Sequence, residues 1–484
     1  MFDKGSKAHL IGIKGVGMTA LAAILKARGV VVTGSDGPSK FFTDKVLADL
    51  QIPITEQFSE ANISDDTDAV IASGAYLHQG HSLNNIEVDT AFGKKIPVFL
   101  YSQALGIIAK EYKVLAVAGS NGKSTTTAML GWILEQVKLD PTVVVGTKVN
   151  GWESNARVAH STSLPAGRHG SGQGQRPWMV VEADEYREAF LRYYPTGAII
   201  TNIDYDHPDY FKTTKSYIEA FENMALQIQP GGFLVGCGDD TEVVKILDAT
   251  KKRGVKTYSY GFGRDNEFQI TEEAITKQKQ CFTIKHKEKS YDLTVPYPGR
   301  QYVLNATGAF ATAVHLGVSH EKIIEAVATF PGTARRLEIL SAKGGSASGG
   351  KNPDDCIIID DYAHHPTAIT VTLEGIKKMY AGKTIVALFQ PHMFSRTQAL
   401  LKEFAACFRP ADVVGIMEIY PSARETSGPV NGKDLAEATS IQHRQVSYLA
   451  DETAAKQFIA AHEKPGTVIV LMGAGNVNDL VKKS

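Results

Sequence analysis

The stretch VLAVAGSNGKSTTTAMLGWILEQ, residues 114–136, decides the fold class of this chain. It begins with the apolar run VLAVA, passes through GSNGKS at 119–124 and continues into a helix-like segment. A strand that enters a helix through a glycine-rich turn opens a parallel α/β unit, and the turn presents backbone N–H groups to an anion. The pattern therefore predicts a phosphate-binding loop at 119–124.

This loop is shorter than a full P-loop, because only Ser120 and Asn121 separate its two glycines. Lys123 is expected to meet the β- and γ-phosphates of a nucleotide, and the Ser124 hydroxyl to hold Mg²⁺. The alternative is a bare turn with chance glycines. The nucleotide-binding prediction covers Gly119, Ser120, Asn121, Gly122, Lys123, Ser124 and Thr125.

Acidic residues end two further strand-like runs, WMVVEADE at 178–185 and GAIITNID at 197–204. A Mg²⁺-nucleotide site needs such hard oxygen ligands to offset the triphosphate charge, and Glu182 is the better candidate for a first metal ligand. The alternative is that these carboxylates cap helices or lie solvated in loops. The candidates are Glu182, Asp184, Glu185, Asp204, Asp206 and the neighbouring His207.

The N-terminal segment predicts a second ligand edge. AHLIGI, KGVGMT, ALAAILKARG and VVVTGSD follow one another as strand, glycine turn, helix and strand, the opening of a Rossmann-like sheet. The glycines Gly12, Gly15 and Gly17 read GxxGxG, Lys14 in the turn suits an anion, and Asp36 closes the second strand. This pattern favours a nucleotide-like diphosphate without identifying it, and the alternative is a purely structural turn.

At roughly 150 residues per domain, 484 residues predict about three domains, and the alternation of strand-like and helix-like segments predicts that all three are α/β. We place them at 1–112, 113–333 and 334–484, with an antiparallel patch at 266–296 and polar, glycine-rich loops at 165–177 and 343–351. A net charge of −1 argues against nucleic acid or a membrane surface as partner. No run approaches the ~18 apolar residues of a membrane span, and four scattered cysteines favour reduced thiols and a cytoplasmic location.

The third domain carries polar residues at two strand ends. Asp360, Asp361 and the two histidines of DDYAHHP follow one apolar run, and His392 and Arg396 of QPHMFSR follow another. Zinc is one interpretation of the histidines, but no acidic or cysteine partner stands at ligand spacing, so substrate contact is favoured.

Taken in order along the whole chain, these motifs resemble those of the Mur ligase family, which builds the peptide stem of bacterial cell-wall precursors. The matching segments are GSNGKS, EADE at 182–185, TNI-D-H at 201–207, Asn305 and Ala306, Arg335 and Arg336, and DDYxHHP at 360–366. FQPHxxxR at 389–396 and IYPSARE at 419–425 resemble the members that add L-alanine.

The resemblance implies an ADP-forming ligase that uses ATP and Mg²⁺ to join the carboxylate of UDP-N-acetylmuramate to L-alanine or another amine, such as a recycled tripeptide. It implies a cytoplasmic monomer or homodimer with Lys123, Glu182 and His207 as catalytic residues. The metal ligands would be Ser124, Glu182 and His207. The further ATP contacts would be Asn305, Arg336 and Asp361, and the amine site would hold His365, His392 and Arg396. The UDP-sugar site would hold Gly12, Lys14, Gly15, Gly17, Ser35 and Asp36.

The sequence departs from the alanine-adding pattern at named positions. Asn121 and Ser124 stand where His and Thr are usual, Gln301 and Tyr302 replace a His-Asn pair, and Met393 replaces an Arg. Tyr186 after EADE resembles the members that reattach tripeptide. Two rival classes are a nicotinamide-dependent dehydrogenase, which leaves GSNGKS unexplained, and a P-loop ATPase without amide synthesis.

Overall fold

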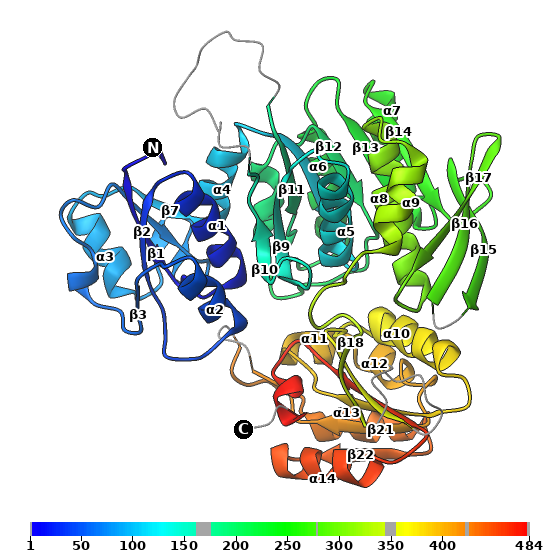
Figure 1. Ribbon diagram of the computed structural model, residues 1–484. Coiled ribbons are helices and arrows are strands. Elements are labelled where there is room, and N and C mark those ends of the chain that lie inside the picture. Colours follow the sequence, from blue (N-terminus) through cyan, green and yellow to red (C-terminus); the bar gives the residue numbers. More distant parts are fainter. Residues whose placement is uncertain (1, 161–175, 277–278, 344–354, 422–424, 482–484) are drawn as a thin grey trace. The chain divides into compact units, whose positions relative to one another are not determined.

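The computed structural model describes residues 2–160, 176–276, 279–343, 355–421 and 425–481 (Figure 1). They divide into two compact units, each described here by itself. The first unit contains Met1–Ile203, Ile218–Tyr260 and Gly308–Ala326; the second contains Asp204–Tyr217, Gly261–Thr307 and Val327–Ser484.

The first unit begins with a parallel sheet in the order β3-β2-β1-β4-β7. β1 is almost fully buried, and the glycine turn after it leads into α1, whose buried face is rich in alanine and leucine. The strands are β1 (Lys7–Ile11), β2 (Val31–Ser35), β3 (Ile54–Thr55), β4 (Ala69–Ala72) and β7 (Val98–Leu100); a small hairpin pairs β5 (Leu77–His78) with β6 (His81–Ser82). The helices are α1 (Val16–Ala27), α2 (Phe42–Asp49), α3 (Ile86–Gly93) and α4 (Tyr101–Ala109). The predicted Rossmann-like opening is confirmed.

A second sheet of the first unit runs in the order β10-β9-β11-β8-β12-β13-β14. Its strands are parallel except β10. β8 lies between β11 and β12 and is apolar and buried from its second residue onward, as expected when helices cover both faces. The strands are β8 (Lys113–Ala118), β9 (Thr142–Val149), β10 (Ser154–Arg157), β11 (Trp178–Glu182), β12 (Gly197–Ile200), β13 (Phe233–Cys237) and β14 (Lys256–Gly261). The helices in this part of the chain are α5 (Lys123–Gln136), α6 (Thr214–Leu226), α7 (Thr241–Lys252), α8 (Arg300–His315) and α9 (His320–Ala328).

The second unit contains the antiparallel patch that alternating residues predict for 266–296. β15 (Phe268–Thr276), β16 (Lys279–His286) and β17 (Lys289–Val295) pair in sequence order. Along β16 every second residue is buried, which is the period of a strand with one face on a core.

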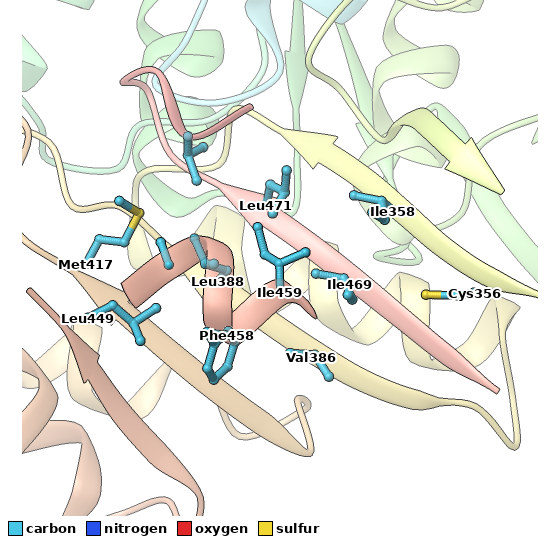
Figure 2. Close-up of a cluster of buried hydrophobic side chains, with 12 residues drawn as sticks. Cys356, Ile358, Val386, Leu388, Met417, Leu449, Phe458, Ile459, Ile469 and Leu471 are labelled. Carbon is cyan, nitrogen blue, oxygen red and sulfur yellow. The ribbon is translucent and has the colours of Figure 1, made fainter. Parts of the chain in front are cut away.

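The second unit also holds a sheet in the order β18-β19-β23-β20-β21-β22, parallel except at its β18 edge. The strands are β18 (Glu338–Lys343), β19 (Cys356–Asp361), β20 (Thr384–Phe389), β21 (Val413–Met417), β22 (Val446–Leu449) and β23 (Thr467–Met472). The helices are α10 (Pro366–Met379), α11 (Phe394–Ala399), α12 (Leu401–Ala406), α13 (Gly432–Ser440) and α14 (Glu452–His462). One core cluster joins side chains of β19, β20 and β23 to Phe458 and Ile459 of α14 (Figure 2). Because the strands from β19 to β22 are parallel, their carboxyl ends lie at one edge of the sheet.

The predicted strands and the loop-to-helix junction are confirmed, whereas the domain boundaries at 112 and 333 remain predictions. Most of the loops predicted at 165–177 and 343–351 lie outside the described residues, as does part of IYPSARE. Every helix within the described ranges is too short or too polar to cross a bilayer. All four cysteines are free thiols, as expected.

Candidate functional site

The phosphate loop joins β8 to α5, and its shape depends on both glycines. Gly119 has φ +133° and Gly122, the N-cap of α5, has φ +85°, conformations that L side chains rarely adopt. A Cβ on Gly119 would lie 2.0 Å from Thr201 Oγ1. The loop therefore requires glycine at both positions.

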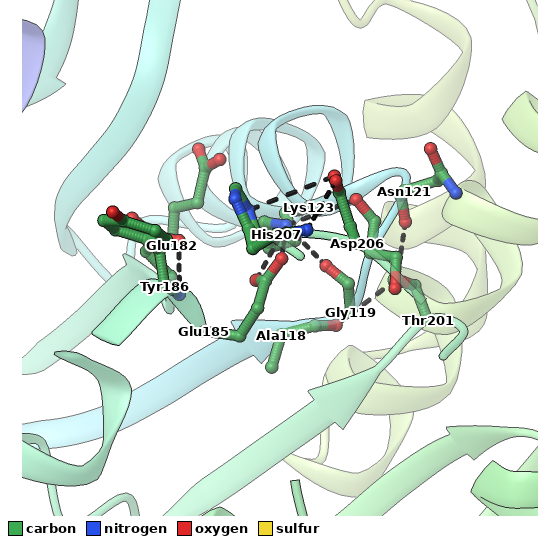
Figure 3. A network of polar contacts seen from close by, with 12 residues as sticks. Ala118, Gly119, Asn121, Lys123, Glu182, Glu185, Tyr186, Thr201, Asp206 and His207 are labelled. Atoms are coloured by element: carbon green, nitrogen blue, oxygen red, sulfur yellow. Dashed lines mark hydrogen bonds and ion pairs between the residues drawn. The ribbon is translucent and has the colours of Figure 1, made fainter. Parts of the chain in front are cut away.

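Two side chains that directly follow β12 form hydrogen bonds with the backbone of this loop. Thr201 Oγ1 donates to the Asn121 carbonyl at 2.6 Å (Figure 3). Asn202 Nδ2 donates to the same oxygen at 2.9 Å. The backbone amide of Asn121 donates to Asn202 Oδ1 at 2.9 Å. These contacts hold the loop's backbone in place, a role that the sequence prediction did not assign to the TN pair.

Lys123 begins α5 and turns back over the loop. Its Nζ lies 2.5 Å from the Gly119 carbonyl and 2.9 Å from Glu185 Oε2 (Figure 3). Burial opposes the charged form, but the carboxylates of Glu185, Asp184 and Glu182 raise the pKa of Lys123 above its ordinary value. The ammonium is therefore retained beside the helix N-terminus, where an anion is favoured.

Ser124 and Glu182, two of the predicted metal ligands, lie together in the first unit. Ser124 Oγ donates to Glu182 Oε1 at 2.8 Å, and the Gly146 amide donates to Oε2. A Cβ on Gly146 would lie 2.8 Å from both carboxylate oxygens, so the glycine allows Glu182 its place. A hydroxyl and a carboxylate at the loop are hard oxygen donors and fit Mg²⁺. Their role as ligands remains a prediction.

His207, the third predicted ligand, belongs to the second unit. It has φ +56°, and its amide donates to Asp206 Oδ1 at 2.7 Å. The Asp206 carboxylate in turn accepts two hydrogen bonds from Arg396, from Nε to Oδ1 at 2.9 Å and from Nη2 to Oδ2 at 3.2 Å. Burial opposes ionisation of Asp206, but the positive charge of the Arg396 guanidinium holds the pKa of Asp206 below its ordinary value. The carboxylate is therefore ionised.

The predicted amine-site residues cluster at one edge of the C-terminal sheet. His365 is the buried N-cap of α10, and Arg396 Nη1 contacts the His392 carbonyl at 3.4 Å. Burial lowers the pKa of His365 and, more strongly, that of His364. Arg396 is engaged with Asp206, a partner that the sequence prediction did not give it.

Among the predicted nucleotide contacts in the second unit, Arg336 lies in the linker before β18, and Asp361 is the last residue of β19. Asp361 Oδ2 accepts from the Leu337 amide at 2.9 Å, and burial raises the pKa of this carboxyl. The buried Tyr302 hydroxyl donates to the Arg336 carbonyl at 2.9 Å. Asn305 lies buried in α8. Tyr302, which replaces a smaller residue of the family pattern, therefore helps to fix the linker that carries Arg336.

The predicted UDP-sugar residues gather at the turn after β1. Gly12 has φ +79°, Gly15 precedes α1 as its N-cap, and a Cβ on Gly17 would lie 2.8 Å from the Tyr101 ring. Asp36 accepts from the Lys14 and Gly37 amides at 2.8 Å each. The turn is thus closely packed.

Lys14 of this turn and Ser35 at the end of β2 both have protein partners. Lys14 Nζ is buried and lies 2.8 Å from Glu56 and 3.2 Å from Asp44. The Ser35 hydroxyl donates to the buried Glu87. Whether either side chain also binds a UDP-sugar remains a prediction.

Comparison with known proteins settles the family. Three family models match the chain: "Mur ligase family, catalytic domain" at residues 7–113, "Mur ligase middle domain" at 117–313 and "Mur ligase, glutamate ligase domain" at 346–475. The UDP-N-acetylmuramate–L-alanine ligase of Desulfitobacterium hafniense is 37% identical over 97% of both chains. The chain belongs to the Mur ligase family.

Other relatives agree with this assignment. The enzyme of the same name from Treponema pallidum (strain Nichols) is 35% identical over 98% of this chain and 94% of its own. The solved UDP-N-acetylmuramate–alanine ligase of Thermotoga maritima has a TM-score of 0.78 at 25% identity and covers 98% of this chain and 97% of its own. A murein peptide ligase of Psychrobacter arcticus, at 24% identity, a TM-score of 0.68 and 99% and 97% coverage, shares the fold.

As a Mur ligase, the protein has the three-domain α/β fold with parallel sheets and is an ATP-dependent, ADP-forming ligase of peptidoglycan precursor synthesis. The predicted fold class, family and enzyme class are confirmed. Neither the dehydrogenase nor the stand-alone ATPase describes this chain.

Proposed function

We propose that this Mur ligase joins the carboxylate of UDP-N-acetylmuramate to the amine of L-alanine, in the cytoplasm, as a monomer or homodimer. Support comes from full-length relatives at 35–37% identity that carry this activity in their names. The observation that carries the chemistry is the position of the Lys123 ammonium and the Ser124–Glu182 pair at the start of α5.

The geometry supports a two-step reaction. A free carboxylate is a poor electrophile, so its oxygen first attacks the γ-phosphorus of ATP; the bond to ADP breaks and an acyl phosphate forms. Lys123 is suited to stabilise the charge on the transferred phosphoryl group, largely by position and electrostatics. The amine then attacks the acyl carbon, inorganic phosphate leaves, and the amine loses a proton.

Ser124, Glu182 and His207 are the residues that would hold Mg²⁺, which neutralises triphosphate charge when bound. Burial lowers the pKa of His365 and so favours its neutral imidazole, the form that could accept a proton in the second step.

The close alternative is a ligase that adds recycled tripeptide to the same sugar nucleotide. Two observations favour keeping it: Tyr186 follows EADE, and the murein peptide ligase fold aligns with almost the whole chain. Met393, buried at the N-cap of α11, removes a cation that could hold the amine's carboxylate.

A panel of amines tests the proposal. UDP-N-acetylmuramate and ATP are incubated with L-alanine, glycine, L-serine or the tripeptide, and phosphate release and product mass are measured. L-alanine should give the fastest turnover; faster turnover with the tripeptide refutes the proposed amine.

The variant Lys123→Ala tests whether Lys123 stabilises phosphoryl transfer from ATP. ADP release that depends on both substrates should fall about 100-fold or more, the scale for losing a preorganised electrostatic contact. Lys45→Ala, which removes an exposed lysine of α2, is the matched control and should leave the rate unchanged. A near wild-type rate for Lys123→Ala contradicts the loop assignment.

A further inference from the structure

Asp206 and Arg396 form a buried ion pair that joins two distant parts of the chain within the second unit. The residues are 190 positions apart, and only 7% of Asp206 and 3% of Arg396 is exposed. Two bonds, 2.9 and 3.2 Å long, connect two nitrogens of the guanidinium to the two carboxylate oxygens. Such a fork fixes orientation as well as distance, which a lysine could not reproduce.

The same carboxylate supports the backbone of its neighbour. Oδ1 of Asp206 accepts from Arg396 Nε and also from the amide of His207, at 2.7 Å. His207 has φ +56°, a left-handed conformation that is uncommon outside glycine and persists only where surrounding contacts enforce it. One oxygen atom therefore connects the guanidinium of Arg396 to the backbone conformation that directs His207.

Arg396 also contacts a residue that follows β20 at the edge of the C-terminal sheet. Its Nη1 contacts the His392 carbonyl at 3.4 Å, and His392 stacks on Tyr420 with ring centroids 6.1 Å apart. Arg396 thus touches Asp206 on one side and another predicted amine-site residue on the other. Any movement of the guanidinium therefore changes its two hydrogen bonds to Asp206.

We propose that Asp206 is a positioning residue that couples the amine site at Arg396 to the metal ligand His207. The inference rests on the roles that the proposed function gives to these two residues. Its consequence is that a change at Arg396 alters metal binding although Arg396 is not a metal ligand. By linkage, metal and amine change each other's affinity by the same factor.

A purely structural ion pair makes a different prediction. Removing it lowers the stability of the fold but leaves the affinity of the folded protein for metal and amine unchanged. The experiment therefore measures binding in variants that thermal denaturation shows to be folded.

Mn²⁺, a paramagnetic substitute for Mg²⁺, is titrated into the full-length protein with a non-hydrolysable ATP analogue, and bound metal is followed by electron paramagnetic resonance. We compare the wild type with Asp206→Asn, Arg396→Gln and the double variant. Arg396→Gln should weaken Mn²⁺ binding about fivefold or more. The double variant should be no weaker than Asp206→Asn alone, because both changes break one connection.

Arg28→Gln is the matched control. It removes another fork-like pair, in which Arg28 bonds to both oxygens of Glu111 at 2.9 Å in the first unit, and should leave Mn²⁺ binding unchanged. If Arg396→Gln does not fold, Arg396→Lys keeps the charge, loses the fork and is held to the same criterion.

Wild-type Mn²⁺ affinity in a folded Arg396 variant overturns the coupling. No Mn²⁺ binding in the wild type overturns the ligand role of His207, and the coupling with it. Weaker Mn²⁺ binding in the Arg396 variants, in an enzyme that fails to ligate L-alanine, supports the coupling and refutes only the proposed amine.

Discussion

Removing the Thr201 hydroxyl should weaken nucleotide binding, because this hydroxyl supports the backbone of the phosphate loop. Thr201→Val keeps the shape of the side chain but deletes the 2.6 Å hydrogen bond to the Asn121 carbonyl. That carbonyl still accepts from Asn202 Nδ2 at 2.9 Å, so it does not become wholly unsatisfied. The expected loss is that of one ordinary hydrogen bond, about 0.5–1.5 kcal/mol.

If the lost hydrogen bond destabilises the loop conformation that binds ATP by this amount, the Kd for ATP rises roughly two- to tenfold, since about 1.4 kcal/mol is a factor of ten. Isothermal titration with a non-hydrolysable ATP analogue measures it. Thr201→Ser, which keeps the hydroxyl and deletes only a methyl group, should bind like the wild type. Equal Kd values for the Val and Ser variants would refute the idea that this hydroxyl supports the loop.

Three further outcomes follow from the described contacts. Glu182→Gln removes a charged oxygen ligand and should raise the Mg²⁺ concentration for half-maximal rate at least about tenfold; an unchanged requirement speaks against a metal role. Burial holds the pKa of His364 well below the ordinary 6.5, so below about pH 6.5 the unfolded chain gains a proton that the folded chain excludes. The free energy of unfolding should therefore fall from pH 7 to pH 5, and less so in His364→Gln; parallel denaturation profiles for the two proteins disprove this. Met393→Arg should sharpen the preference for L-alanine over glycine and L-serine in competition assays, and identical selectivity before and after the change rejects that role.

The parts of the fold that the sequence predicts are local ones. The junction of β8, the phosphate loop and α5 is visible because strand, turn and helix are contiguous, and the alternation along β16 reveals the antiparallel patch. Each depends on residues within a few positions of one another, where apolar period and glycine content carry the information.

The features that the sequence did not predict are contacts between residues far apart in the chain. Thr201 reaches Asn121 across 80 positions and Arg396 reaches Asp206 across 190, and no local pattern reports either pair. Lys14 is the clearest case: a lysine in a glycine turn suggests an anionic ligand, but its buried ammonium is met by Glu56 and Asp44. A buried charge needs partners, and only the path of the following loop decides whether the protein supplies them.

The central place of β8 has a consequence for synthesis of the chain. β8 is the first strand of its sheet to leave the ribosome, yet its register pairs Leu115 with Gly197 of β12 on one side and with Val180 of β11 on the other. At about 5–20 residues per second, the roughly 80 residues up to β12 take on the order of 4–16 s to be made. During that time the apolar strand lacks at least one of its two neighbours, so it is open to aggregation before the nucleotide site can form.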